Sequence, residues 1–400
     1  MPARTFRESW ALRQQINSVL GFHYPECIDH RYGGYCLNRD EREGYIYERR
    51  GKHLVGTCRM VYTFCVGARL DGPKWCRSAA THGLTFLFDA FRDDDRGGFD
   101  WLLRGRETVD DTRRCYGHAF SLLACAAATE VGLPRASDRL EQVASLLDER
   151  FFKPEYGLHR AEADGDWSFS NYRGQNANMH ACEAYLAAFD ATNESDYLDR
   201  AYTVAESLVR DPPAGGGLIP EHYTREWKPD LEYNQAEPNH QFRPPGFQPG
   251  HHAEWAKLLL LLADRREESW LAERARGLFD AAFEIGWDEE YGGFYYTVDA
   301  GGEPIVPEKY GWPIAEGIGA AALLGREDEG SSLERYDRLW DYAREFLINE
   351  KYGIWYEKCT REGERIAPAS DGPRVEPGYH PVANAALAMA AFEDDRPRPI

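Results

Sequence analysis

Two kinds of helix-forming segment alternate along the chain. Segments of the first kind are amphipathic, with bulky apolar residues at three- and four-residue spacing, which places them on one face of a helix. Two sets show this spacing: Val143, Leu146, Leu147 and Phe151, and Leu339, Tyr342, Phe346 and Leu347. Segments of the second kind are Ala-rich and apolar nearly all round, at 120–128, 181–188, 254–263, 318–324 and 385–392. A helix that is apolar all round is buried, so the second kind is predicted to lie inside the first.

A glycine-containing turn follows the amphipathic segments and recurs six times. Each copy has one to three glycines, usually after charged residues, and then aromatic or aliphatic residues that predict a short strand or hairpin. The last glycines of the six copies are Gly34, Gly98, Gly157, Gly217, Gly293 and Gly353. They lie about 60 residues apart, with one insertion before Gly293, and such a period indicates stacked units that do not bury their apolar faces alone.

Six pairs of outer and inner helices close most naturally into a ring. We therefore predict an all-α fold, an (α/α)6 barrel of six inner and six outer helices with short hairpins in the connections. Residues 1–400 would form a single catalytic domain, with a central pocket lined by the inner helices. An open helical solenoid is the alternative. The connection 212–249, rich in proline and charge, is interpreted as an ordered functional loop because apolar structure continues on both sides.

Charge narrows the classes of partner. The chain has 47 basic and 67 acidic residues, a formal net charge of −20, which argues against nucleic acid or an anionic membrane surface. The N-terminus lacks an apolar signal core and the longest apolar run, 385–392, is too short to span a bilayer, so we expect a cytoplasmic protein. The acidic, lysine-poor composition resembles that of halophilic proteins, or simply that of a soluble acidic protein. Acidic turns such as Asp93–Asp95 are interpreted as solvated.

Nine cysteines are scattered from Cys27 to Cys359 without a C-x-x-C pair. This pattern predicts reduced, buried thiols and no structural zinc site.

Polar residues recur near the predicted starts of the inner helices. We expect them to face the pocket and to form its site: Arg59, Tyr116, His118, Asn176, His180, His251, Glu254, Trp312, Glu316 and His380. His251 and Glu254 share one helical face, where the carboxylate would orient the imidazole and raise its pKa toward neutrality, as suits a general base. Trp312 would stack on a sugar ring or pack in the core. The alternative for a lone histidine at a helix start is a capping or core role.

Metal binding is the rival interpretation of the His251–Glu254 pair. Zinc sites usually have three protein ligands, often with histidines four residues apart, and no such pattern is present. No phosphate-binding glycine motif is present either. We therefore predict no metal.

Two stretches resemble the N-acylglucosamine 2-epimerase superfamily. They are Tyr172-Arg-Gly-Gln-Asn-Ala-Asn-Met-His180-Ala-Cys-Glu and Phe242-Arg-Pro-Pro-Gly-Phe-Gln-Pro-Gly-His251-His-Ala-Glu254-Trp. Shorter supporting pieces are Arg59-Met-Val-Tyr, Tyr116-Gly-His118-Ala-Phe, Gly311-Trp312-Pro-Ile-Ala-Glu316 and Gly378-Tyr-His380. The likeness covers nearly the whole chain and is greatest to the branch of mannose isomerases and sulfoquinovose isomerases.

The resemblance implies cofactor-free proton transfer between C1 and C2 of a reducing monosaccharide through an enediol(ate). Its acid–base pair corresponds to His251 and His380, with His251 moving the proton and His380 assisting ring opening or protonation. The residues implied around the sugar are Arg59, Asn176, His180 and Glu254, with Tyr116 and Trp312 at the ring. The residues 375–379 before His380 lack the basic and aromatic flank of the epimerases, which leaves N-acetyl or disaccharide specificity without support.

The leading hypothesis is an aldose–ketose isomerase that interconverts mannose and fructose, or lyxose and xylulose. The alternatives are a sugar 2-epimerase on the same scaffold, a sulfoquinovose isomerase, an (α/α)6 glycoside hydrolase using Glu254 and Glu316, and a non-catalytic binding protein. A hydrolase needs two opposed carboxylates. A homo-oligomer is compatible with all of these.

Overall fold

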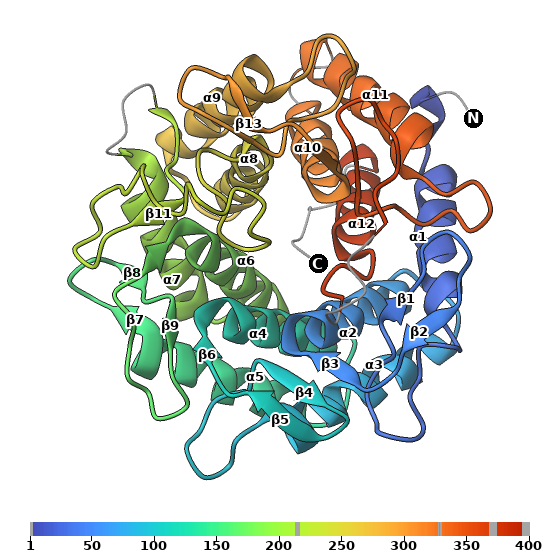
Figure 1. Cartoon of the computed structure of the whole chain (residues 1–400), viewed down its shortest axis with the longest axis vertical. Coiled ribbons are helices and arrows are strands. Elements are labelled where there is room, and N and C mark those ends of the chain that lie inside the picture. Colours follow the sequence, from blue (N-terminus) through green and yellow to red (C-terminus); the bar gives the residue numbers. More distant parts are fainter. Residues whose placement is uncertain (1–2, 213–216, 327, 329, 368–373, 394–400) are drawn as a thin grey trace.

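The computed structural model describes residues 3–212, 217–326, 328, 330–367 and 374–393, and within them the helices form two concentric rings (Figure 1). The inner ring consists of α2 (Leu54–Arg69), α4 (Cys115–Glu130), α6 (Gln175–Thr192), α8 (Pro249–Ala263), α10 (Gly311–Leu324) and α12 (Tyr379–Phe392). The outer ring consists of α1 (Ser9–His23), α3 (Trp75–Phe86), α5 (Ala136–Leu146), α7 (Ser195–Ala205), α9 (Ser269–Gly286) and α11 (Ser331–Tyr342).

The inner ring is closed. Each inner helix packs against the next, and α12 packs against α2. The first helix, α1, packs against the last, α12, so the two ends of the chain complete one ring (Figure 1). The predicted (α/α)6 barrel is confirmed, and closure distinguishes it from an open solenoid.

The predicted apolar faces form the core between the two rings. Leu140, Val143 and Leu147 are buried on the outer side, and the Ala-rich face of α4 is buried against them. Four outer helices end in a π-helical turn that continues their apolar face, at Leu87–Phe91, Leu147–Phe151, Glu206–Arg210 and Ala343–Leu347. Both predicted kinds of helix are thus present where the periodicity placed them.

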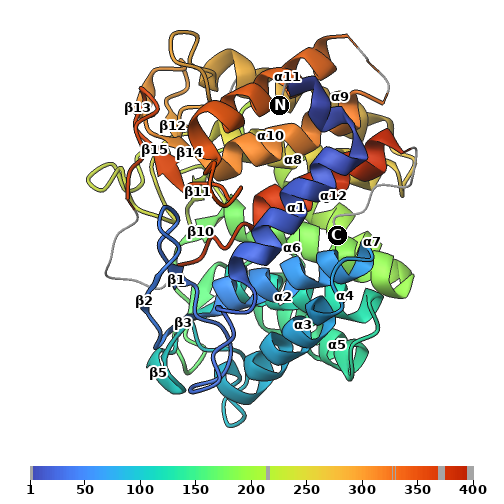
Figure 2. The same cartoon turned by 90° about the vertical axis from the view of Figure 1, so that its right-hand side faces the viewer.

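Short strands gather at the end of the barrel where the inner helices begin (Figure 2). They are β1 (Asn38–Arg39), β2 (Ile46–Glu48), β3 (Gly51–His53), β4 (Leu102–Arg104), β5 (Glu107–Asp110), β6 (Arg113–Arg114), β7 (Phe152–Lys153), β8 (Leu158–His159), β9 (Glu162–Ala163), β10 (Arg173–Gly174), β11 (His222–Tyr223), β12 (Thr297–Val298), β13 (Pro304–Val306), β14 (Lys309–Tyr310) and β15 (Lys358–Cys359). The strands before α2, α4, α6 and α10 each pair with a strand of the following repeat: β3 with β4, β6 with β9, β10 with β11 and β14 with β15. This pairing joins neighbouring repeats at the mouth of the pocket.

The six repeated turns share one backbone conformation. The last glycine of every copy has a positive φ, between 62° at Gly34 and 83° at Gly98, a region that side chains other than glycine rarely enter. Asp94 and Asp95 are exposed, as the sequence suggested, but other acidic residues of the repeated turns form ion pairs with buried cations. Asp93 lies 2.5 Å from the buried guanidinium of Arg113, and Asp288 lies 3.0 Å from the buried ammonium of Lys309. These two ion pairs hold their turns against the strands that lead into α4 and α10.

All nine cysteines are buried and free, as predicted. Burial raises the pKa of the Cys58 thiol to about 12, so that thiol stays protonated at neutral pH. Among the described residues, no helix combines the length and apolarity that crossing a membrane would require.

Candidate active site

The inner helices surround a cavity at the end of the barrel where they begin. The side chains that line it occupy the same places in successive helices. The second residues of α4, α6, α10 and α12 are Tyr116, Asn176, Trp312 and His380, and the sixth residues of α2, α6 and α8 are Arg59, His180 and Glu254. Together with His251, the third residue of α8, these are eight of the ten predicted site residues. The remaining two, His118 and Glu316, do not line the cavity.

His251 is oriented by a carboxylate that sequence reasoning missed. Its Nδ1 lies 2.9 Å from both carboxylate oxygens of Glu221, in the connection just before β11. Gln175 donates a hydrogen bond from Nε2 to Glu221 Oε2 at 3.0 Å and accepts one at Oε1 from Trp255 Nε1 at 2.8 Å. Gln175 Nε2 also lies 2.7 Å from His251 Nδ1, so the amide and the imidazole both stand beside the one carboxylate. Burial raises the pKa of Glu221, but His251 and Gln175 together lower it by more than burial raises it, so the carboxyl is an anion. The Glu221 carboxylate favours the tautomer of His251 with its proton on Nδ1, so Nε2 is unprotonated and directed toward the pocket.

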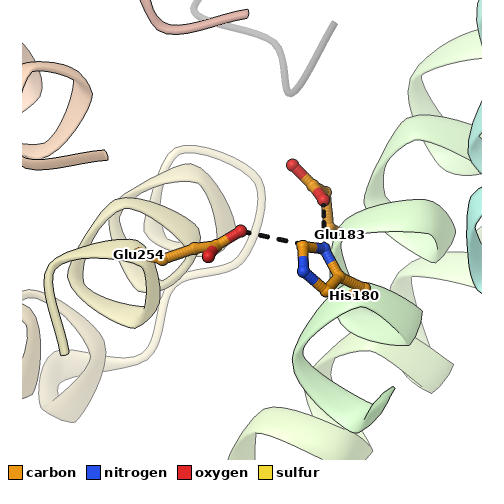
Figure 3. A group of neighbouring side chains, drawn as sticks. All are labelled: His180, Glu183 and Glu254. Atoms are coloured by element: carbon orange, nitrogen blue, oxygen red, sulfur yellow. Dashed lines mark hydrogen bonds and ion pairs between the residues drawn. The ribbon is translucent and has the colours of Figure 1, made fainter. Parts of the chain in front are cut away.

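The predicted partner of His251, Glu254, does not orient it. Glu254 turns toward α6, where its Oε1 lies 3.7 Å from Nδ1 of His180 (Figure 3). Glu183 takes the hydrogen bond from that nitrogen at 2.9 Å. The sequence placed Glu254 correctly on the same helical face as His251, but Glu221 comes from a connection whose path the sequence pattern does not reveal.

Glu254 has an unusual environment for a carboxyl group. It is fully buried, and neither of its oxygens has a hydrogen-bond partner among the described residues. Burial and the neighbouring carboxylates of Glu316 and Glu183 raise the pKa of Glu254 well above its usual value, against the opposing effect of Lys257. This environment favours the protonated form of Glu254, which can donate its proton to a ligand in the pocket.

His380 forms a second histidine–glutamate pair across the pocket. Its Nδ1 lies 2.7 Å from Glu316 Oε1. Its Nε2 lies 3.2 Å from Arg59 Nη2 and 3.7 Å from Glu376 Oε1. Burial lowers the pKa of His380, but Glu376 and Glu316 outweigh burial and Arg59 and raise it to about 9. Glu316 was predicted to bind substrate; the structure instead places it behind His380, where it orients the ring.

Arg59 supplies a fixed positive charge beside His380. Its guanidinium pairs with Glu376 and donates a hydrogen bond to the Tyr116 hydroxyl at 3.0 Å. The group also lies over the rings of Phe120 and Tyr379, with distances of 4.4 and 5.1 Å to the ring centroids. These contacts hold the guanidinium at the cavity wall, where it can stabilise a developing oxyanion.

An aromatic ring lies between the two imidazoles. The Trp312 ring centroid is 4.9 Å from that of His251 and 5.8 Å from that of His380. Sequence reasoning missed several further lining residues, of which three come from the connection 212–249, namely Gln241, Phe242 and Gln248. The prediction that this connection is functional is thus consistent with where its residues lie.

His118 is a correction to the predicted site. Its Nδ1 lies 2.7 Å from the Arg114 carbonyl oxygen, and its Nε2 accepts a hydrogen bond from the Phe99 backbone N–H at 3.1 Å. His252 makes the same pair of contacts, with the Gln248 carbonyl and the Ile219 N–H. Both histidines are fourth residues of their helices and face outward, so they fasten the glycine turn to the inner helix. Counting residues from the glycine placed His118 with His180, although the two differ by half a turn.

Two groups of side chains have the residue types of a metal site. One is His180, Glu183 and Glu254, and the other is Glu254, Glu316 and His380, each with candidate ligand atoms within 4.8 Å of one another. Lys257 Nζ already lies 2.5 Å from Glu316 and 3.7 Å from Glu183, so a divalent cation would have to enter beside a buried ammonium. The donor set therefore suits protons better than a metal ion.

Comparisons with known proteins agree with this geometry. The family model described as N-acylglucosamine 2-epimerase matches residues 34–383. The D-mannose isomerase of Marinomonas mediterranea is 38% identical over 92% of this chain and 94% of its own length, and that of Thermobifida fusca is 37% identical over 92% and 90%. A crystal structure of a D-mannose isomerase superposes with a TM-score of 0.91, at 34% identity, over 97% of this chain and 98% of the other. The protein therefore belongs to the N-acylglucosamine 2-epimerase family.

Proposed function

We propose that this protein is a cofactor-independent aldose–ketose isomerase for a free monosaccharide of the mannose and fructose type, with His251 and His380 as its acid–base pair. The observation that carries the proposal is the pair of histidine–glutamate dyads on one cavity. In each dyad a buried carboxylate accepts from Nδ1, so Nε2 is the ring nitrogen that would exchange protons with the substrate; in His380 it also lies 3.2 Å from Arg59 Nη2. The D-mannose isomerases that resemble the chain over most of its length support the choice of substrate.

The two dyads suit different steps. His380, with a pKa raised to about 9, is cationic at neutral pH and can give a proton to O1 of the open-chain aldose. His251, with Nδ1 held by Glu221, presents Nε2 as the base that removes the proton from C2. Returning that proton to C1 while His380 recovers the proton of O2 completes the ketose. The C2–H bond is exchanged for a C1–H bond, and both histidines regain their starting states.

The oxyanion of the enediolate needs donors that are already in place. Arg59 offers a guanidinium whose direction is fixed by Glu376 and Tyr116, and Glu254 offers a buried proton with no competing partner among the described residues. Both side chains line the same cavity as the two histidines.

The test is to incubate the enzyme with mannose in heavy water and identify the products. We expect fructose carrying some deuterium at C1, with turnover reduced by orders of magnitude in His251→Ala and in His380→Ala while both variants remain folded. Fructose formation at a near-native rate in either variant would refute the histidine pair.

A 2-epimerase is the second candidate, because it shares the enediolate and the same residues and returns the proton to the opposite face of C2. Glucose as the sole product would establish that outcome instead. A hydrolase is disfavoured because Glu316, one of its two proposed carboxylates, is already bound by His380, Asn384 and Lys257.

A further inference from the structure

A buried lysine lies one helical turn below the pocket floor and takes no part in the steps above. Lys257 is on α8, three residues after Glu254, and is 3% exposed. Its Nζ lies 2.5 Å from Glu316 Oε2 and 3.7 Å from Glu183 Oε1. One ammonium group thus stands between carboxylates of two other inner helices, α10 and α6.

The first of these carboxylates holds the His380 side of the site. Glu316 Oε1 accepts hydrogen bonds from His380 Nδ1 at 2.7 Å and from Asn384 Nδ2 at 2.8 Å. Its other oxygen, Oε2, faces Lys257. The carboxylate that orients the ring of His380 therefore also forms an ion pair with Lys257.

The second carboxylate holds the opposite wall. Glu183 Oε2 lies 2.9 Å from His180 Nδ1 (Figure 3). Its Oε1 accepts a hydrogen bond from the Tyr379 hydroxyl at 2.8 Å. Tyr379 is the neighbour of His380 in α12. Glu183 therefore fixes a pocket side chain and the first residue of the helix that carries the second dyad.

Two carboxylates buried in the same apolar layer would not both remain ionised without a cation. Burial lowers the pKa of Lys257, but Glu316 and Glu183 together raise it by more than burial lowers it, so the ammonium stays charged. In return, Lys257 lowers the pKa of both Glu316 and Glu183 against the effect of burial. Each charge in this layer depends on the other two.

We propose that Lys257 is a positioning residue that keeps Glu183 and Glu316 ionised together and thereby sets the proton affinity of His380. The inference rests on the proposed function only for its kinetic consequence, because the state of His380 can be measured without substrate. Lys257 lies 2.5 Å from Glu316 but 3.7 Å from Glu183, so its removal costs Glu316 the closer cation, and Glu316 is the carboxylate that takes up a proton. A protonated Glu316 no longer stabilises the imidazolium, so His380 loses its proton at lower pH.

Besides Glu316 on α10, other charged or titratable groups face His380, and their side chains must be the same in the comparison. They are Arg59 on α2, Glu376 on the connection before α12, Glu254 on α8 and His180 on α6. Because Lys257→Met alters none of these side chains, a shift in the titration of His380 reports the loss of the ammonium.

The experiment measures the titration of His380 by NMR in the substrate-free protein, with the resonance assigned by its loss in His380→Gln. We expect Lys257→Met to lower the midpoint by about one pH unit and kcat by about 10- to 100-fold, with KM nearly unchanged. Lys52→Met is the matched control, since Lys52 is equally buried and pairs with Asp29 at 2.6 Å in a turn outside both dyads. It should lose stability while the His380 midpoint stays in place.

A wild-type midpoint in Lys257→Met, with a loss of stability like that of Lys52→Met, would overturn the proposal. If Lys257→Met does not fold, the double variant Lys257→Met/Glu183→Gln removes one charge of each sign and should fold. Its His380 midpoint should lie near that of the wild type because Glu316, with no second anion in the layer, stays ionised without Lys257. A midpoint a full unit lower there would also overturn the proposal. The NMR result stands even if mannose is not the substrate.

Discussion

Replacing Glu221 by glutamine tests whether the missed carboxylate makes His251 a base. The variant keeps the size of the side chain and removes its charge. Glu221 faces Nδ1 with both oxygens at 2.9 Å, so it can only accept. Glutamine can instead donate its amide proton to Nδ1, which moves the ring proton to Nε2, the nitrogen that must remove the proton from C2.

The loss can be estimated from the charge pair. When His251 takes the substrate proton, it becomes an imidazolium beside the Glu221 carboxylate. Two unit charges about 4 Å apart attract by about 4 kcal/mol at an effective dielectric constant of about 20. About 1.4 kcal/mol corresponds to tenfold in rate, so kcat should fall by about 10³-fold. The substrate meets the other side of the ring, so KM should change little.

The assay is steady-state fructose formation from mannose, with thermal unfolding as a check on folding. Asp190→Asn is a matched control, because Asp190 is a buried carboxylate paired with Arg265 at 2.5 Å near the far end of α6. It should lower the unfolding temperature and leave kcat unchanged. A folded Glu221→Gln enzyme whose kcat lies within about threefold of the wild type would refute the orienting role.

Three further outcomes are expected. The free-enzyme parameter kcat/KM should fall above about pH 9, where His380 loses its proton, and Glu376→Gln should move that fall to lower pH because Glu376 raises this pKa; an unchanged profile would contradict the acid role. His118→Ala should lower the free energy of unfolding by about 2 to 4 kcal/mol, since a buried N–H loses its acceptor, with kcat nearly unchanged; a large loss of kcat in the folded variant would return His118 to the site. Activity should survive EDTA, and a loss restored by a divalent metal would revive a metal site at His180, Glu183 and Glu254.

Much of the fold could be predicted because it depends on local periodicity repeated six times. The spacing of Val143, Leu146 and Leu147 defines one helix face, and the repeated glycines require positive φ at one place in every unit. The ring closure followed from the number of units. The role of the acidic turns could not be predicted, because the partner of Asp93 is Arg113, twenty residues away, and only the folded turn brings them together.

The candidate site was predictable where it depends on helix position and not where it depends on loops. Arg59, His180 and Glu254 are found at equivalent places because the inner helix begins at the same point in each of their repeats. Glu221 was missed because it lies in the long connection before α8, where the lengthened repeat hides which residues reach the inner helix. Glu316 was placed correctly in its helix, but its function depends on contacts with α8 and α12 that spacing along one helix does not contain.

The balance of charge at the pocket floor accounts for how the proposed anionic intermediate would be stabilised in a chain with a net charge of −20. Three buried or partly buried anions of the floor are matched by three cations, namely Glu183, Glu316 and Glu376 with Lys257, Arg59 and His380, and Glu221 beside His251 is a fourth buried anion. Glu254 keeps its proton and adds no charge. When His251 removes the C2 proton, the imidazolium pairs with Glu221 while the negative charge moves onto the sugar. The total charge of the buried site is constant throughout, so catalysis depends on where the donors point rather than on an excess of positive charge. The acidic surplus of the chain lies outside this balanced cluster.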